Sequence, residues 1–109
     1  MQYLHGGWRR RRKMKYTDKF GLRLSQIGLG TGRFGTVVDN GKSFEMLDMF
    51  YEHGGNVIDT ARNYYEWVED GRGKSEQTIG TWMEERGVRE KMIISTKGGV
   101  RNEGKIFYI

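Results

Sequence analysis

Three residues in the middle of the chain have side chains that could transfer a proton together. Asp59 ends a short apolar run, Lys97 ends a second run that starts at Met92, and Tyr64 follows five residues after Asp59. A tyrosine titrates near ~10 in water and is a poor acid at neutral pH, but a neighbouring ammonium group favours the phenolate. A carboxylate paired with that ammonium keeps it charged and aimed. The trio therefore predicts a tyrosine that acts as a general acid toward a carbonyl oxygen.

The same residues also have a purely structural interpretation. Asp59 could cap a loop, Tyr64 could be a surface aromatic, and Lys97 could be a solvated strand end. On spacing alone this structural interpretation is slightly preferred. The chemical interpretation requires both runs to be neighbouring strands of one parallel sheet, because the carboxyl ends of such strands meet at one edge.

The pattern of apolar residues predicts elements that would place the trio in this way. A β-hairpin is expected first, and then further strands, at residues 15–17, 22–24, 27–29, 56–59 and 92–96. A first helix is expected to begin at Ser43 as its N-cap and to end at His53, before two glycines. A second is expected to begin at Lys74 or Ser75 and to end at Gly87. Strands that alternate with helices imply an α/β fold with a parallel sheet and right-handed crossovers.

Two glycine-containing motifs suggest phosphate binding. Residues 30–35 match the G-x-G-x-x-G pattern of Rossmann-type dinucleotide binders. That mechanism needs a helix that opens within the motif, so that its N-terminus meets the pyrophosphate. Because residues 36–42 intervene, a Rossmann-type binder is kept only as an alternative. Residues 73–75 are similar to a P-loop, but Val68 stands where that motif needs its first glycine.

Composition excludes several classes of function. The 109 residues include no cysteine, which excludes disulfides, thiolate metal sites and cysteine nucleophiles, and the two histidines form no metal-ligand cluster. Five of the 19 bases and no acid lie in residues 1–13, so the rest of the chain has 14 bases and 14 acids. A basic patch on a folded face is the footprint of nucleic-acid binding, and one terminal run is not. No apolar run is long enough to span a bilayer. We therefore expect no nucleic-acid partner, no membrane and a cytoplasmic location.

The basic run at residues 1–13 does not resemble part of a domain. We expect a leader there, either a spurious one translated from upstream of a natural start at Met14 or a disordered arm. The folded domain is then expected at residues 14–109.

Several short motifs together resemble the aldo-keto reductase family. The most specific are the D-T-A-x-x-Y segment at residues 59–64 and the G-x-S-E helix start at residues 73–76. Trp67 resembles one of the family's bacterial branches. The other motifs occur in the family's order and approximate spacing, at residues 28–32, 79–80 and 96–99. The resemblance covers residues 14 to about 109.

This resemblance implies a fold and a set of roles. The family's domain is a (β/α)8 TIM barrel, with an N-terminal hairpin that closes the bottom of the barrel. The chain is thus expected to form the N-terminal portion of such a barrel, incomplete, with the hairpin and about three strands. Active sites of these barrels lie at the carboxyl ends of the strands. By resemblance, Tyr64 is the general acid, Lys97 tunes it, and Asp59 pairs with Lys97.

The resemblance also implies NADPH as the cofactor and a small aldehyde or ketone as the substrate. Gly30, Thr31 and Gly32, together with Asp59, would border the nicotinamide, from which hydride passes to the carbonyl carbon. The family's catalytic histidine and its main adenosine-phosphate segments lie beyond the part that this chain matches. The chain is therefore expected to be a reductase fragment that is inactive by itself. The alternative is a truncated, non-catalytic binding module.

Overall fold

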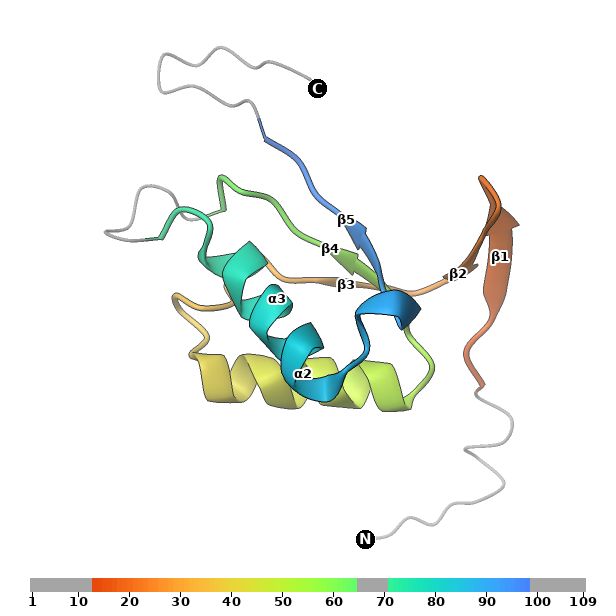
Figure 1. Cartoon of the computed structure of the whole chain (residues 1–109), viewed down its shortest axis with the longest axis horizontal. Helices are drawn as coiled ribbons and strands as arrows, with labels where there is room; N and C mark the ends of the chain where they lie inside the picture. The colour runs from red at the N-terminus through yellow and green to blue at the C-terminus, as the bar shows by residue number, and fades with distance from the viewer. Residues whose placement is uncertain (1–12, 65–70, 99–109) are drawn as a thin grey trace, which may run out of the picture.

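The chain begins with a small β-hairpin. The structure is a computed structural model that describes residues 13–64 and 71–98. Strand β1 (Tyr16–Lys19) pairs antiparallel with β2 (Leu22–Ser25), as the sequence predicts. The hairpin stands to one side of the remaining elements (Figure 1). The predicted leader at residues 1–13 lies, except for its last residue, outside the described part of the chain.

A parallel sheet of three strands forms the centre of the molecule. Its order is β3 (Gly28–Gly30), β4 (Val57–Asp59) and β5 (Ile93–Ser95). The register aligns the last residues of all three strands, so their carboxyl ends share one edge. The predicted parallel sheet is confirmed. Strand β3 begins one residue later than predicted, and Ile27, which was expected to be buried in it, is 64% exposed.

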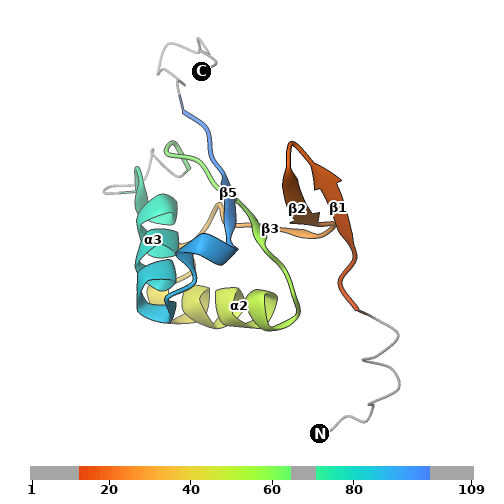
Figure 2. The ribbon, with the colours of Figure 1, turned by 45° about the vertical axis from the view of Figure 1, so that its right-hand side comes forward.

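Two helices connect these strands and lie on the same side of the sheet (Figure 2). Helix α2 (Asn40–Glu52) joins β3 to β4. Helix α3 (Lys74–Arg86) precedes β5 and ends at Gly87, whose φ of 66° is the left-handed conformation that glycine adopts without strain. A short 3-10 helix, η1 (Arg89–Lys91), which the sequence reading did not predict, lies between α3 and β5.

The start of α2 differs from the prediction. Its N-cap is Asp39, whose carboxylate accepts a hydrogen bond from the Lys42 backbone N–H at 2.8 Å. Ser43 is fully buried within the first turn instead, and its hydroxyl donates to the Val38 carbonyl. The N-cap is therefore Asp39, four residues before the predicted Ser43. The helix still begins after Gly35, the last glycine of the G-x-G-x-x-G motif, so the Rossmann alternative lacks its helix N-terminus.

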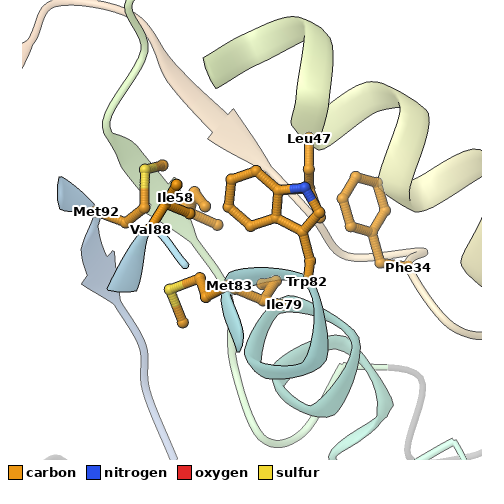
Figure 3. Close-up of a cluster of buried hydrophobic side chains, with 8 residues drawn as sticks. All are labelled: Phe34, Leu47, Ile58, Ile79, Trp82, Met83, Val88 and Met92. Carbon is orange, nitrogen blue, oxygen red and sulfur yellow. The ribbon is translucent and has the colours of Figure 1, made fainter. Parts of the chain in front are cut away.

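The core lies between the sheet and the two helices. Figure 3 shows its eight buried side chains, which come from the glycine loop, both helices, strand β4 and the segment between α3 and β5: Phe34, Leu47, Ile58, Ile79, Trp82, Met83, Val88 and Met92. Trp82 of α3 is fully buried, and its indole N–H donates to Asp48 of α2 at 2.8 Å. Arg86 donates to both oxygens of the same carboxylate. These hydrogen bonds to Asp48 join α2 and α3, which pack against the strands that carry the site.

Candidate active site

Asp59 and Lys97 meet because their strands are neighbours in register. Asp59 is the last residue of β4 and pairs with Gly30 of β3 on one side and Ser95 of β5 on the other. Lys97 follows two residues after the end of β5. The backbone continues the alignment beyond the strands, since Arg62 donates its N–H to the Lys97 carbonyl at 3.0 Å. The acid and the amine therefore lie at one edge of the sheet.

The Lys97 ammonium group is surrounded by three oxygen atoms. Its Nζ lies 2.8 Å from Asp59 Oδ1, 2.7 Å from the Thr60 carbonyl oxygen and 3.3 Å from Tyr64 Oη. An ammonium group has three donors, and each of them has a geometrically reasonable acceptor here. The lysine is therefore held in one place by side chains and backbone together.

Tyr64 completes the cluster. Its hydroxyl donates to Asp59 Oδ2 at 3.1 Å and accepts from Lys97. The ammonium also lies 5.2 Å from the centre of the tyrosine ring. All three sequence-predicted proton-transfer residues thus form one hydrogen-bonded group. A carbonyl oxygen brought to the phenol would take the place of Asp59 as the acceptor of its proton.

Asp59 and Lys97 each shift the pKa of the other toward the charged form. Partial burial raises the pKa of Asp59, but hydrogen bonds from Lys97 and Tyr64 outweigh it and bring the pKa below its usual value. For Lys97, partial burial lowers the pKa, and the hydrogen bonds to Asp59 and Tyr64 reverse this and raise it. Both groups therefore stay ionised at neutral pH. The side chains are 45% and 52% exposed, so the pair is accessible from solvent.

Three of the four residues predicted to border a nicotinamide lie at the end of the first parallel strand or just after it, and the fourth, Asp59, ends the next strand. Gly30 faces open space, and a side chain added at Gly32 would meet only the Tyr64 ring, at 4.0 Å. Glycines here leave room for a flat group beside the tyrosine. Thr31 differs, because it is buried and its hydroxyl donates to the Asp59 carbonyl oxygen at 2.8 Å. The Thr31 side chain thus points into the interior and binds the backbone of Asp59.

Two further contributions were not foreseen from sequence. The Thr60 carbonyl is an acceptor for Lys97, which no side-chain pattern could indicate because it is a backbone group. The hydroxyl of Ser75, in the first turn of α3, contacts both Thr31 and Thr60. Ser75 belongs to the G-x-S-E motif that carries the family resemblance. The sequence therefore marked this residue, but it did not show that the Ser75 hydroxyl contacts two strand ends.

Metal-ligand clusters and membrane-spanning helices are absent among the described residues. Within residues 13–64 and 71–98, no group of three or more metal-ligating side chains is close enough to hold a metal ion, and no helix has the length and apolar character to cross a membrane. His53 caps the end of α2, with its ring nitrogen 2.8 Å from the Met49 carbonyl oxygen. Trp67 and the loop around it lie outside the described residues.

Comparison with models of protein families shows to which family the chain belongs. The model of the aldo/keto reductase family matches residues 26–107, which include the whole parallel sheet and the proton-transfer cluster. The chain belongs to the aldo/keto reductase family. Oxidoreductase chemistry is therefore the function of its family, as the motifs at residues 59–64 and 73–76 predict.

Curated relatives in this family include fungal enzymes. The chain is 43% identical over 84 residues to norsolorinic acid reductase of Aspergillus flavus, a match that covers 71% of this chain and 20% of that protein. It is 41% identical over 85 residues to the aryl-alcohol dehydrogenase [NADP(+)] of Phanerodontia chrysosporium, with the same coverage of 71% and 20%. The chain thus spans about a fifth of the length of these relatives.

Solved structures give the same family. The holo form of an aldo-keto reductase from Bacillus halodurans superposes with a TM-score of 0.66 at 30% sequence identity, and the match covers 88% of this chain and 30% of that chain. The structural neighbours are aldo-keto reductase TIM barrels. The aldo-keto reductase sheet described above is therefore part of a (β/α)8 barrel, which confirms the predicted fold class.

Proposed function

We propose that this chain supplies the acid–base part of a carbonyl reductase active site. The observation that carries the proposal is the convergence of the Tyr64 hydroxyl, the Lys97 ammonium and the Asp59 carboxylate at the carboxyl edge of a barrel sheet. In TIM barrels this edge is where active sites are built. Oxidoreductase chemistry is the activity of the family to which the chain belongs.

In the proposed reaction Tyr64 donates its proton to the oxygen of an aldehyde or ketone. Lys97, held by Asp59 and the Thr60 carbonyl, stabilises the phenolate that this leaves behind. A general acid in position contributes typically ~10²–10⁴-fold to such a step. Asp59 keeps the ammonium charged and in place. The half-exposed cluster is open to an approaching substrate.

The proposed cofactor is NADPH, which when bound supplies hydride to the carbonyl carbon. The open space at Gly30, and at Gly32 beside the Tyr64 ring, fits the nicotinamide end of this molecule, because among the described residues an added side-chain carbon would meet no atom at Gly30 and only the Tyr64 ring at Gly32. Thr31 would contact the nicotinamide through its backbone, since its hydroxyl already donates a hydrogen bond to the Asp59 carbonyl oxygen. The name of the Phanerodontia chrysosporium relative, an aryl-alcohol dehydrogenase [NADP(+)], supports this choice of cofactor.

An aromatic carbonyl compound is the proposed substrate class. The relatives reported above are named for the reduction of norsolorinic acid and for the oxidation of aryl alcohols. Substrate contacts beyond the described residues would come from the rest of a barrel, since this chain matches 20% of those relatives. We further propose that the folded domain is residues 14–109 and that the protein acts in the cytoplasm.

The experiment that tests the proposal places the cluster in a complete barrel. The matching segment of the Bacillus halodurans reductase is replaced by residues 13–98 of this chain, and kcat is measured with NADPH and an aromatic aldehyde. The substitution Tyr64→Phe should then lower kcat by about 10²-fold or more. Tyr51→Phe is the matched control, because Tyr51 packs edge-on against Trp82 in the core, away from the cluster.

Each outcome of this experiment is decisive. A chimera in which Tyr64→Phe and Tyr51→Phe have the same small effect on kcat would refute the role of Tyr64. An active chimera in which Lys97→Met leaves kcat unchanged would refute the support that we assign to the lysine. If the segment restores a folded barrel that binds NADPH and shows no turnover, a non-catalytic binding module becomes the better interpretation.

A further inference from the structure

Three buried hydroxyl groups lie directly behind the Tyr64–Lys97–Asp59 cluster. Ser75 Oγ is 2.8 Å from Thr31 Oγ1 and 2.7 Å from Thr60 Oγ1, and each of the three residues is 1% exposed. They come from the end of β3, the end of β4 and the first turn of α3. Ser75 therefore joins two strand ends and one helix at a single point.

The hydrogens of this network run in one direction. Thr31 Oγ1 contacts the Asp59 carbonyl oxygen at 2.8 Å, and a carbonyl can only accept, so the one hydroxyl hydrogen of Thr31 goes there. In its contact with Ser75, Thr31 must then be the acceptor. The Ser75 hydrogen is directed at Thr31, at its hydroxyl and its carbonyl, which lies 2.9 Å away. Thr60 must therefore donate to Ser75.

Ser75 does not serve as the cap of its own helix. The N-cap of α3 is Gly73, and no side chain makes a capping hydrogen bond there. A serine in the first turn of a helix commonly bonds to the local backbone, but this one points across to the strand ends. Burying hydroxyl groups costs free energy unless they are paired, and each of these three hydroxyls has a hydrogen-bond partner.

The network ends on the backbone segment that carries the site. The Asp59 carbonyl receives the Thr31 hydroxyl, and it also receives the Thr31 N–H at 3.2 Å. The carbonyl of the next residue, Thr60, receives the Lys97 ammonium at 2.7 Å. One two-residue segment thus presents the Asp59 carboxylate and a backbone acceptor to the same lysine. A rotation of this segment would therefore change the positions of both acceptors relative to Lys97.

We propose that Ser75 is a positioning residue for this active site, acting through Thr31 and Thr60 to fix the Asp59–Thr60 peptide and thereby the place of the Lys97 ammonium. The inference rests on the proposed function for its catalytic meaning. The hydrogen bonds that Ser75 makes are present in the chain without cofactor or substrate. Ser75 touches no reacting atom in this account.

The test compares two variants that each remove one buried hydroxyl group from α3. Ser75→Ala removes the positioning hydroxyl. Thr78→Val is the matched control, because Thr78 is also buried and its hydroxyl bonds to Asn40 at the start of α2. The titration of the Asp59 carboxyl and of the Lys97 ammonium is followed by NMR in the full 109-residue chain without ligands. Thermal unfolding of each variant is measured alongside.

Ser75→Ala should raise the Asp59 titration midpoint toward 3.8 and lower that of Lys97 toward 10.5, because the two groups are held together less well. Thr78→Val should leave both midpoints unchanged. A purely structural serine would lower the unfolding temperature in the same way as Thr78→Val and would leave both titrations where they are in the wild type. That result would overturn the proposal.

A second variant keeps the test decisive if Ser75→Ala does not fold. Thr31→Val has nearly the same shape as the wild type and removes the donor to the Asp59 carbonyl, so it should shift the two titrations in the same directions. In the double variant the shifts should be less than additive, because both changes break one chain of hydrogen bonds. Strictly additive shifts, or none in Thr31→Val, would refute the network. Loss of the Tyr64→Phe effect on kcat would instead refute the proposed function and leave these titrations intact.

Discussion

The Lys97 ammonium has three acceptors, yet its ion pair with Asp59 contributes little to folding. Both side chains are about half exposed, and ion pairs of this kind are worth ~0–1 kcal/mol because water screens them. The short contacts to Asp59, Thr60 and Tyr64 therefore have their effect in fixing geometry. This is the expected property of a catalytic cluster, in which position matters more than stability.

A pH dependence follows from the two pKa shifts. The lowered pKa of Asp59 means that its contribution to stability is present above the unfolded value of 3.8 and is lost as the pH falls through the folded value. The raised pKa of Lys97 means that its contribution is present below 10.5 and is lost as the pH rises through the folded value. We expect Asp59→Asn to lower the unfolding free energy by about 0.5 kcal/mol at pH 7.

Urea unfolding at a series of pH values checks this prediction. The difference between wild type and Asp59→Asn should disappear below the folded pKa of Asp59, where the wild-type carboxyl is also neutral. Asp18→Asn on the exposed hairpin is the control for a general effect of lost negative charge. A difference that persists unchanged to the acid end would show that the ion pair is not its origin.

At the scale of elements, the hairpin turn contains an unfavourable residue. Phe20 has a φ of 53°, the left-handed region, and its side chain is 92% exposed. Two-residue hairpin turns with positive φ at both positions favour Asn-Gly, and Gly21 already supplies the second half with a φ of 72°. Phe20→Asn should therefore stabilise the protein by about 1 kcal/mol.

The measurement is the denaturant midpoint of the purified variant. Gly21→Ala should move the midpoint in the opposite direction, because alanine is strained at this φ. If Phe20→Asn proves destabilising, the exposed ring would have a packing partner that the described residues do not contain.

Helix α2 offers a matched pair for testing the core. Leu47 is fully buried against the sheet, whereas Met49 on the same helix is 62% exposed. Leu47→Ala should lower the unfolding free energy by about 2–5 kcal/mol, because it loses buried surface and leaves a cavity. Met49→Ala should change it by no more than about 0.5 kcal/mol. Thermal or urea unfolding distinguishes the two, and equal losses would mean that α2 packs through a different face.

Sequence reasoning located the elements well wherever a local signal decided them. The hairpin, the three parallel strands and the end of α3 at Gly87 follow from apolar patterns and from glycine. The start of α2 was wrong because both Asp39 and Ser43 can cap a helix, and only the packing of the first turn chooses between them. The meeting of Asp59 and Lys97 follows from strand register, which brings strand ends together. Tyr64 lies in the loop after β4, and on spacing alone a structural interpretation of the trio is slightly preferred.

The parts that escaped prediction depend on tertiary contacts. A backbone acceptor such as the Thr60 carbonyl has no sequence signature, and its role becomes visible only when Lys97 lies beside it. The 3-10 helix is a short adjustment between α3 and β5. The inward direction of the Ser75 hydroxyl likewise depends on two strand ends that are far from it in sequence.

At the scale of the whole molecule, the described sheet is one part of a barrel. Strands β3 and β5 each pair on one side only within the described residues, and the helices lie on one face. The chain matches 30% of the Bacillus halodurans reductase. We therefore predict that the purified 109-residue chain shows no measurable NADPH oxidation with an aromatic aldehyde. Absorbance of the reduced nicotinamide follows this directly, and turnover that disappears in Tyr64→Phe would contradict it.

The proposals all depend on one structural claim, that Tyr64, Lys97 and Asp59 form a single cluster in this chain. NMR measurement of nuclear Overhauser effects in the 109-residue protein tests it most directly. We expect cross-peaks between the Lys97 side-chain protons and the Tyr64 ring, whose centre lies 5.2 Å from Nζ. The absence of these cross-peaks, in a protein whose amide contacts show β4 and β5 paired, would contradict it.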